Sequence, residues 1–102
     1  MIDGPNNPAS PNEIEKIDAF NDLLRNDGHW VTAAGIVGPE RATLIDNRGE
    51  KGEVQSASLF NSKEYYSGFW LIEAGSAEEA RRLALAGSQA CNRKVELRSY
   101  IQ

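Results

Sequence analysis

Hydrophobic and polar positions recur with two different periods along this chain. Between residues 10 and 27 the apolar side chains stand three or four positions apart, with charged residues on the other faces: Ile14, Ile17, Phe20, Leu23 and Leu24. Ser10-Pro11-Asn12-Glu13 has the composition of a helix start, in which Ser10 caps and Glu13 completes a capping box. Gly28 suits a left-handed C-terminal cap. The pattern predicts an amphipathic helix that begins near Ser10 and ends before Gly28.

A second helix is predicted from residue 76 onwards. Ser76-Ala77-Glu78-Glu79 forms another capping box. Ala77, Ala80, Leu83 and Ala84 follow at helical spacing and make a narrow face of mostly small residues, which permits close packing on a sheet. Gly87 marks the end of this helix or lies near it.

The middle of the chain predicts strands. Residues 29–37 alternate loosely, and Gly35 places a bend or bulge among them. Residues 42–46 and residues 54–58 flank a polar turn at residues 47–52, so we expect a hairpin there.

The second half of the chain predicts two more strands. Residues 61–67 read as a loop, and residues 69–74 form a short apolar run between Ser67-Gly68 and Gly75-Ser76. Such a run is typical of a strand buried on both faces, or nearly so. Residues 94–101 alternate cleanly between apolar and polar side chains, which predicts a closing strand.

The element order indicates an α+β domain. Residues 1–9 are rich in turn formers and read as an irregular arm, so the domain proper spans residues 10–102. A helix, several strands, a helix and a strand predict an antiparallel sheet with both helices on one face. Two helices are too few to cover both faces. We therefore expect a homodimer, in which a second copy hides the remaining face.

Composition narrows the functional classes. Eleven Lys+Arg against 15 Asp+Glu give a formal net charge of -4, which argues against nonspecific nucleic-acid binding. Cys91 is the single cysteine, so no intrachain disulfide forms and a reducing compartment is indicated. No apolar run approaches the roughly 20 residues of a membrane-spanning helix, and the first residues lack the pattern of a secretory signal. A cytoplasmic protein that is not attached to a membrane is the expectation.

An ordered set of short motifs runs along the chain: Ala19-Phe20-Asn21-Asp22-Leu23-Leu24, Gly28, Ala34-Gly35-Ile36, Gly38-Pro39, Ser62-Lys63-Glu64, Gly68-Phe69-Trp70-Leu71-Ile72-Glu73, Ala77-Glu78-Glu79-Ala80 and Val95-Glu96-Leu97-Arg98. In order and spacing this set resembles the YCII-related (DGPF-type) family of the dimeric α/β-barrel superfamily. The resemblance covers roughly residues 10 to 101. It implies a ferredoxin-like fold and dimers. Most members have no known activity, and a few are enzymes, including a dehydrochlorinase attributed to a His–Asp pair.

The chain departs from that family at three places. Ser56-Ala57-Ser58-Leu59 stands where the family carries Asp-Gly-Pro-Phe, and Ile17 or Asn21 falls where enzymatic members place a histidine. Both halves of the acid–base pair are thus missing. The apolar first strand, which is central in a ferredoxin-like sheet, is missing too, and its neighbours' backbone groups need partners. Either residues 94–101 close up against residues 69–74, or a strand of the partner chain fills the gap.

Aromatic and polar residues of the middle segments are the candidate ligand contacts. The set is His29, Trp30, Ser56, Lys63, Tyr65, Tyr66 and Trp70. Aromatic side chains with a few polar groups are typical of a small-molecule site, although they also fill cores and interfaces. His29 at a helix end is more typical of a capping residue than of a catalytic base. We expect no metal site and no cofactor, because no ligand cluster stands at the right spacing.

The leading functional hypothesis is a small dimeric, non-catalytic domain that binds a small apolar or aromatic ligand at the dimer seam. One alternative is an enzyme of the lyase or dehydrochlorinase-like type that uses non-standard residues around His29 and residues 63–66. Another is a protein–protein interaction module whose exposed sheet face docks a partner.

Overall fold

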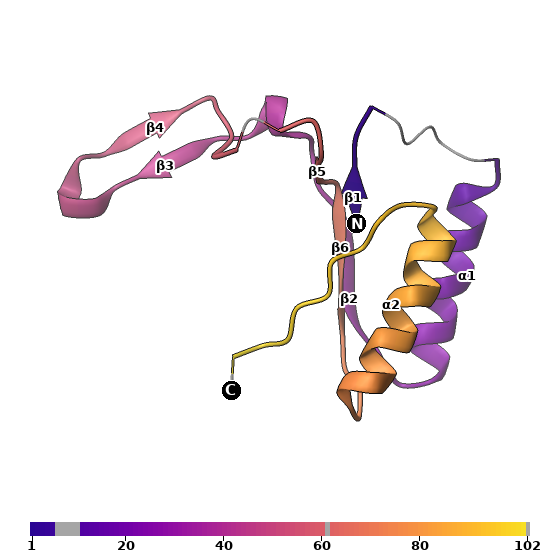
Figure 1. Ribbon diagram of the computed structural model, residues 1–102. Helices are drawn as coiled ribbons and strands as arrows, with labels where there is room; N and C mark the ends of the chain where they lie inside the picture. Colours follow the sequence, from indigo (N-terminus) through magenta and orange to yellow (C-terminus); the bar gives the residue numbers. More distant parts are fainter. Residues whose placement is uncertain (6–10, 61, 102) are drawn as a thin grey trace.

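A computed structural model of the chain describes residues 1–5, 11–60 and 62–101. It is a mixed α+β structure, with two helices and small antiparallel sheets, which confirms the predicted class. Helices α1 (Glu13–Asn26) and α2 (Ala77–Cys91) lie on the same side of the strand pair β2 (Trp30–Gly35) and β6 (Gly68–Ile72) (Figure 1).

The first helix ends as its sequence predicts. The N–H of His29 donates to the carbonyl of Leu24 over 2.9 Å and that of Gly28 to Arg25 over 3.3 Å, with Gly28 at φ 78°. These two bonds form a Schellman motif, which requires a left-handed residue at this position. The predicted Ser10 cap itself lies outside the described residues. The helix begins at Glu13, with Asn12 at the N-cap position and no side-chain capping bond there, so Glu13 does not hold the predicted capping-box position. At the start of the helix, Glu13 forms an ion pair with Arg93.

The second helix begins as predicted but runs further. The Ser76 hydroxyl accepts a hydrogen bond of 3.1 Å from the N–H of Glu79, which is one half of the predicted capping box. The Glu79 carboxylate accepts from the N–H of Gly75 over 2.8 Å instead of from Ser76. The helix ends at Cys91, one turn beyond the expected end near Gly87. Gly87 is buried inside the helix, where an added Cβ would lie 3.2 Å from the ring of Phe20. This glycine therefore serves the close approach of the two helices rather than a helix end.

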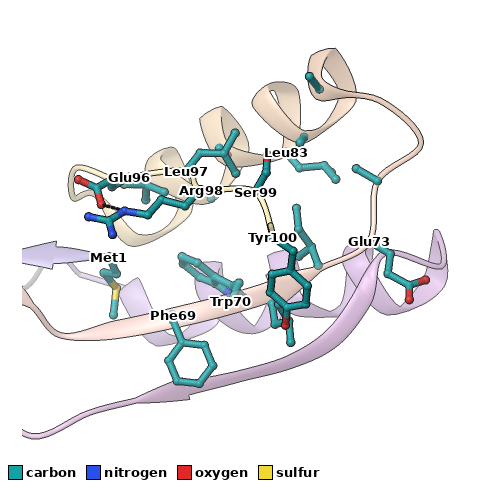
Figure 2. Close-up of a pocket in the computed structure, with 18 of the residues that line it drawn as sticks. Met1, Phe69, Trp70, Glu73, Leu83, Glu96, Leu97, Arg98, Ser99 and Tyr100 are labelled. Carbon is teal, nitrogen blue, oxygen red and sulfur yellow. Dashed lines mark hydrogen bonds and ion pairs between the residues drawn. The ribbon is translucent and has the colours of Figure 1, made fainter. Parts of the chain in front are cut away.

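The central strands are shorter and more exposed than the sequence predicts. β2 and β6 pair antiparallel from Trp30 opposite Ile72 to Gly35 opposite Gly68, and the irregular step lies between Trp30 and Thr32 rather than at Gly35. Phe69 and Trp70 point to opposite sides of β6 (Figure 2). Phe69 is 47% exposed, so the expectation of a strand buried on both faces is wrong for the single chain.

The predicted hairpin projects from the rest of the molecule (Figure 1). β3 (Leu44–Asp46) pairs with β4 (Glu53–Gln55), and Ile45 stands opposite Val54. Both of these side chains are 66% exposed. The turn is held by the Asn47 side chain, whose oxygen accepts a 2.9 Å bond from the N–H of Gly52. We call residues 36–60 the hairpin arm.

The two ends of the chain differ most from prediction. β1 (Ile2–Asp3) is a short strand within the expected irregular arm, of which residues 6–9 lie outside the described part. It pairs with β5 (Tyr65–Tyr66), within the expected loop, and Ile2 also bridges to Lys94. That bridge is all that forms of the predicted closing strand, since residues 95–100 have no regular structure. An alternating pattern makes a strand only where a partner edge is within reach.

The buried core is small for a chain of this length. Phe20, Leu24 and Leu83 form the buried cluster, and Trp30, Trp70, Ile72 and Ala90 pack against it. Cys91 is buried as well. The radius of gyration is 16.0 Å, against about 13 Å for a compact chain of about 100 residues. Much apolar surface is therefore left exposed, including that of the hairpin arm.

Candidate functional site

A hollow lies between β6, α2 and residues 95–100 (Figure 2). We call it the β6–α2 groove. Its volume is about 950 Å³. Most side chains that line it are aromatic or aliphatic: Phe20, Tyr66, Phe69, Trp70, Ile72, Leu83, Val95, Leu97 and Tyr100. Such a lining with few polar groups is typical of a binding site for an apolar ligand.

Trp70 is the best anchored of these side chains. Its indole Nε1–H donates a hydrogen bond of 2.7 Å to the Asn21 Oδ1. Its ring meets that of Phe20 edge to face, with centroids 5.3 Å apart. A buried indole needs a partner for its N–H, and α1 supplies it. The wall of the groove is thereby held rigidly against the helix layer.

The polar end of the groove is a cluster of Tyr66, Glu96 and Arg98. The Tyr66 hydroxyl donates to the Glu96 Oε2 over 2.7 Å, and the Arg98 Nε–H donates to the same oxygen. The hydrogen bond to Glu96 raises the pKa of Tyr66 and, conversely, lowers the pKa of Glu96. Sequence reasoning missed Glu96 and Arg98 as site residues. The signal was present, because both lie on the polar side of the alternating residues 94–101.

His29 takes a structural position at the base of the sheet. Its Nδ1 lies 2.8 Å from the carbonyl oxygen of Glu73. Since a carbonyl can only accept, Nδ1 carries the proton and Nε2 is the acceptor of the neutral ring. The same Nδ1 is 3.8 Å from the Glu79 Oε1, too far for a hydrogen bond. His29 is not among the residues that line the groove.

The remaining sequence-predicted residues divide between the core and the surface. The guanidinium carbon of Arg25 lies 4.1 Å from the ring centroid of Trp30. Trp30 also lines a smaller hollow together with Trp70. Tyr65 stands opposite Asp3 in the β5–β1 pair. Ser56 and Lys63 are exposed and lie outside the groove. The structure thus brings Tyr66 and Trp70 together in the groove, and the other five candidates lie elsewhere.

The described residues offer little for covalent or metal chemistry. No group of three His, Cys, Asp or Glu side chains among them is placed to hold a metal ion. Cys91 is buried, and burial raises the pKa of its thiol, which makes it a poor nucleophile at neutral pH. The Asn21 amide oxygen is used by Trp70.

Comparison with known protein families finds no match, and no curated protein matches the sequence. Among the helices that the structure describes, none has the length and apolar character to cross a membrane.

Proposed function

We propose that the chain is one subunit of a small non-catalytic homodimer of the ferredoxin-like type, whose β6–α2 groove binds an apolar ligand. The strand neighbours support the fold. Lys94 bridges to β1, β1 pairs with β5, and β6, which follows β5 after one residue, pairs with β2. Both helices lie on one side of this arrangement. The same order is implied by the resemblance to the YCII-related family and its dimeric α/β-barrel superfamily.

The large solvent-exposed surface area of the single chain is the observation that supports the proposed dimer. The chain exposes 7874 Å², whereas a compact folded monomer of this mass exposes about 5,700 Å². The excess of roughly 2,200 Å² per chain is in the range that obligate dimers bury. It includes large hydrophobic side chains that a lone subunit would leave in water.

The sheet face away from the helices is the surface that the second copy covers in this proposal. Phe69 lies on that side of β6, and the hairpin arm extends beyond it with Ile45 and Val54 exposed. A symmetric pair would place the same face of each subunit against the other. The hairpin arms would then reach around the partner.

The groove lining supports a small apolar or aromatic molecule as the ligand. Trp70, Phe69 and Tyr100 offer aromatic surfaces, and the Tyr66–Glu96–Arg98 cluster supplies polar groups that orient a bound molecule. We place this dimer in the cytoplasm, where a free thiol such as Cys91 stays reduced.

Analytical ultracentrifugation across micromolar concentrations tests the dimer. The wild-type chain is expected to sediment as a dimer, and Phe69→Asp as a monomer. Ile14→Asp is the matched control, because Ile14 is 76% exposed but lies on α1, on the helix side of the sheet. A folded wild-type monomer at high micromolar concentration would refute the dimer.

The fluorescent probe anilinonaphthalene sulfonate tests the groove. Its binding is expected to weaken at least tenfold in Leu97→Glu, which places a charge in the lining, and to persist in the exposed control Leu85→Glu. Equal binding by both variants would remove the groove as the site.

A further inference from the structure

One edge of β6 is unpaired along the groove beyond Gly68, whose carbonyl accepts a 3.1 Å bond from the amino group of Met1. The N–H of Glu73 donates to His29 and the carbonyl of Ser67 accepts from Ile36, so the odd-numbered residues from Phe69 to Glu73 direct their backbone groups toward the β2 side. Alternation along a strand then directs the N–H and C=O groups of Trp70 and Ile72 to the opposite edge, which borders the groove. Within the described residues, β2 is the single strand that pairs with β6.

The opposite wall of the groove is also an unpaired backbone. Residues 95–100 line it, and within the described part of the chain they make no backbone hydrogen bond to another segment. They are held by side chains instead, through Tyr66, Glu96 and Arg98. The groove is therefore bounded on two sides by extended chain with free donors and acceptors, which the lining of a small-molecule pocket does not require.

The distance between these walls is set by β1. Ile2 stands opposite Tyr66 on one side and bridges to Lys94 on the other. The carbonyl of Met1 accepts a 2.9 Å bond from the N–H of Ser67 at the mouth of the groove. One strand thus already lies between the walls, which places them two strand spacings apart, about 9.6 Å. At its Met1 end the groove therefore continues the line of β1, with room for one strand between the two walls.

The position of β1 also explains why residues 95–100 do not pair with β6. The expectation that residues 94–101 pack directly on residues 69–74 is not met, because β1 holds the two segments apart at Lys94. The groove runs from Met1 at one end to Glu73 at the other (Figure 2). Ala80 and Ala84 of α2 line it with small side chains, which leaves room for the side chains of an added strand.

We infer that the β6–α2 groove is an acceptor site for an extended peptide strand of another protein, with apolar side chains at alternate positions. The strand would add to β6 through Trp70 and Ile72 and to residues 95–100 on its other edge, as in β-strand addition. Residues 95–101 of a second copy are not available as the donor, because they form the wall of that copy's own groove. The inference rests on the proposed function only in using the same groove, and it does not require the dimer.

Filling the groove in cis tests this inference on the full chain. A five-residue extension of alternating Thr and Val is placed before Met1, after a new initiating methionine, in both phases (TVTVT and VTVTV). The phase that directs its apolar side chains to α2 is expected to raise the Tm by about 5 °C or more. Matched controls carry Pro in place of the second and fourth residues, which removes the donors of those residues, and are expected to leave the Tm unchanged.

A second measurement uses a fluorescein-labelled TVTVT or VTVTV peptide in trans. The wild-type chain is expected to bind the peptide of the stabilising phase, and the stabilised extended variant is expected to have lost that binding. The inference would be overturned if the extended variants of both phases had the same Tm as their proline controls. If anilinonaphthalene sulfonate binds the groove while neither extension raises the Tm, the inference fails and the proposed function stands. A stabilising extension that converts a wild-type dimer to monomer would identify the second copy as the donor and overturn the assignment to another protein.

Discussion

Trp70 of β6 and Asn21 of α1 are joined by a hydrogen bond of 2.7 Å between the indole Nε1–H and the amide Oδ1. An indole nitrogen can only donate, so the amide oxygen, not its NH₂ group, faces the ring. The bond links the wall of the groove to the helix layer, next to the Phe20 ring. Asn21 is engaged in holding Trp70.

Replacing Asn21 with Ala should lower the free energy of unfolding by about 1–2 kcal/mol. The indole N–H is partly buried and would lose its partner, which costs more than a lost surface bond. Asn21→Asp keeps an acceptor oxygen and should lose less. Equilibrium urea unfolding followed by tryptophan fluorescence measures both variants. Equal stability of Asn21→Ala and the wild type would show that the bond contributes nothing.

Replacing Gly87 with Ala should destabilise the protein by about 1 kcal/mol, although alanine favours helices. The new Cβ would lie 3.2 Å and 3.3 Å from two ring carbons of Phe20. That ring is buried and fixed edge to face on Trp70, so it cannot retreat without disturbing the core. Thermal unfolding checks this, with Gln89→Ala, at an exposed position of the same helix, as the control that should not destabilise. A Gly87→Ala chain more stable than the wild type would contradict the close packing.

Replacing Arg93 with Met should lower the free energy of unfolding by about 3 kcal/mol. Arg93 is 10% exposed and forms ion pairs with Asp3 and Glu13, which are 22% and 14% exposed. Its loss leaves two carboxylates close together with little solvent, and it detaches β1 from α1. The control is Arg48, which pairs with Asp46 but is itself 85% exposed, and Arg48→Met should leave stability nearly unchanged. Urea titrations of the two variants give the comparison, and similar losses in both would refute the buried role of Arg93.

The Tyr66–Glu96 contact should make the titration of Tyr66 depend on Glu96. The pKa of Tyr66 is raised from its ordinary value of 10.0, so the stability from its retained proton is full below pH 10 and is lost as the pH rises through the folded pKa. The pKa of Glu96 is lowered from 4.5, so its contribution is present above pH 4.5 and is lost as the pH falls through the lowered value.

Tyrosinate absorbance, taken as wild type minus Tyr66→Phe, measures the Tyr66 titration. Its midpoint should lie above pH 10.0 in the wild type and fall in Glu96→Gln. Arg98→Gln should move it the other way, because the nearby positive charge of Arg98 lowers the pKa of Tyr66. If Glu96→Gln left the titration midpoint of Tyr66 unchanged, the hydrogen bond between Tyr66 and Glu96 would not form in solution.

Local patterns in the sequence were sufficient for the helices and the hairpin. The Ser76–Glu79 contact and the Gly28 cap depend on residues within one helical turn, so the residue types at these positions specify the local backbone geometry. The same holds for the turn that Asn47 closes. Of the site, the aromatic residues Tyr66 and Trp70 were predicted, because apolar runs and aromatic pairs are visible in the sequence.

Contacts between distant segments decided the rest. His29 was a candidate on chemistry alone, but its place is fixed by the carbonyl of Glu73, which no local pattern indicates. Glu96 and Arg98 entered the site because residues 95–100 run beside Tyr66.

The sequence by itself determined two capped amphipathic helices, a polar-tipped hairpin and an α+β class, because each depends on residues within a few positions of one another. Only the tertiary structure decided which strand edges meet. Ile2 reaches both Tyr66 and Lys94 and so keeps β6 and residues 95–100 apart. Strand pairing joins segments that are far apart in the chain, and its register is set by the backbone of both partners, so no single stretch of sequence contains it.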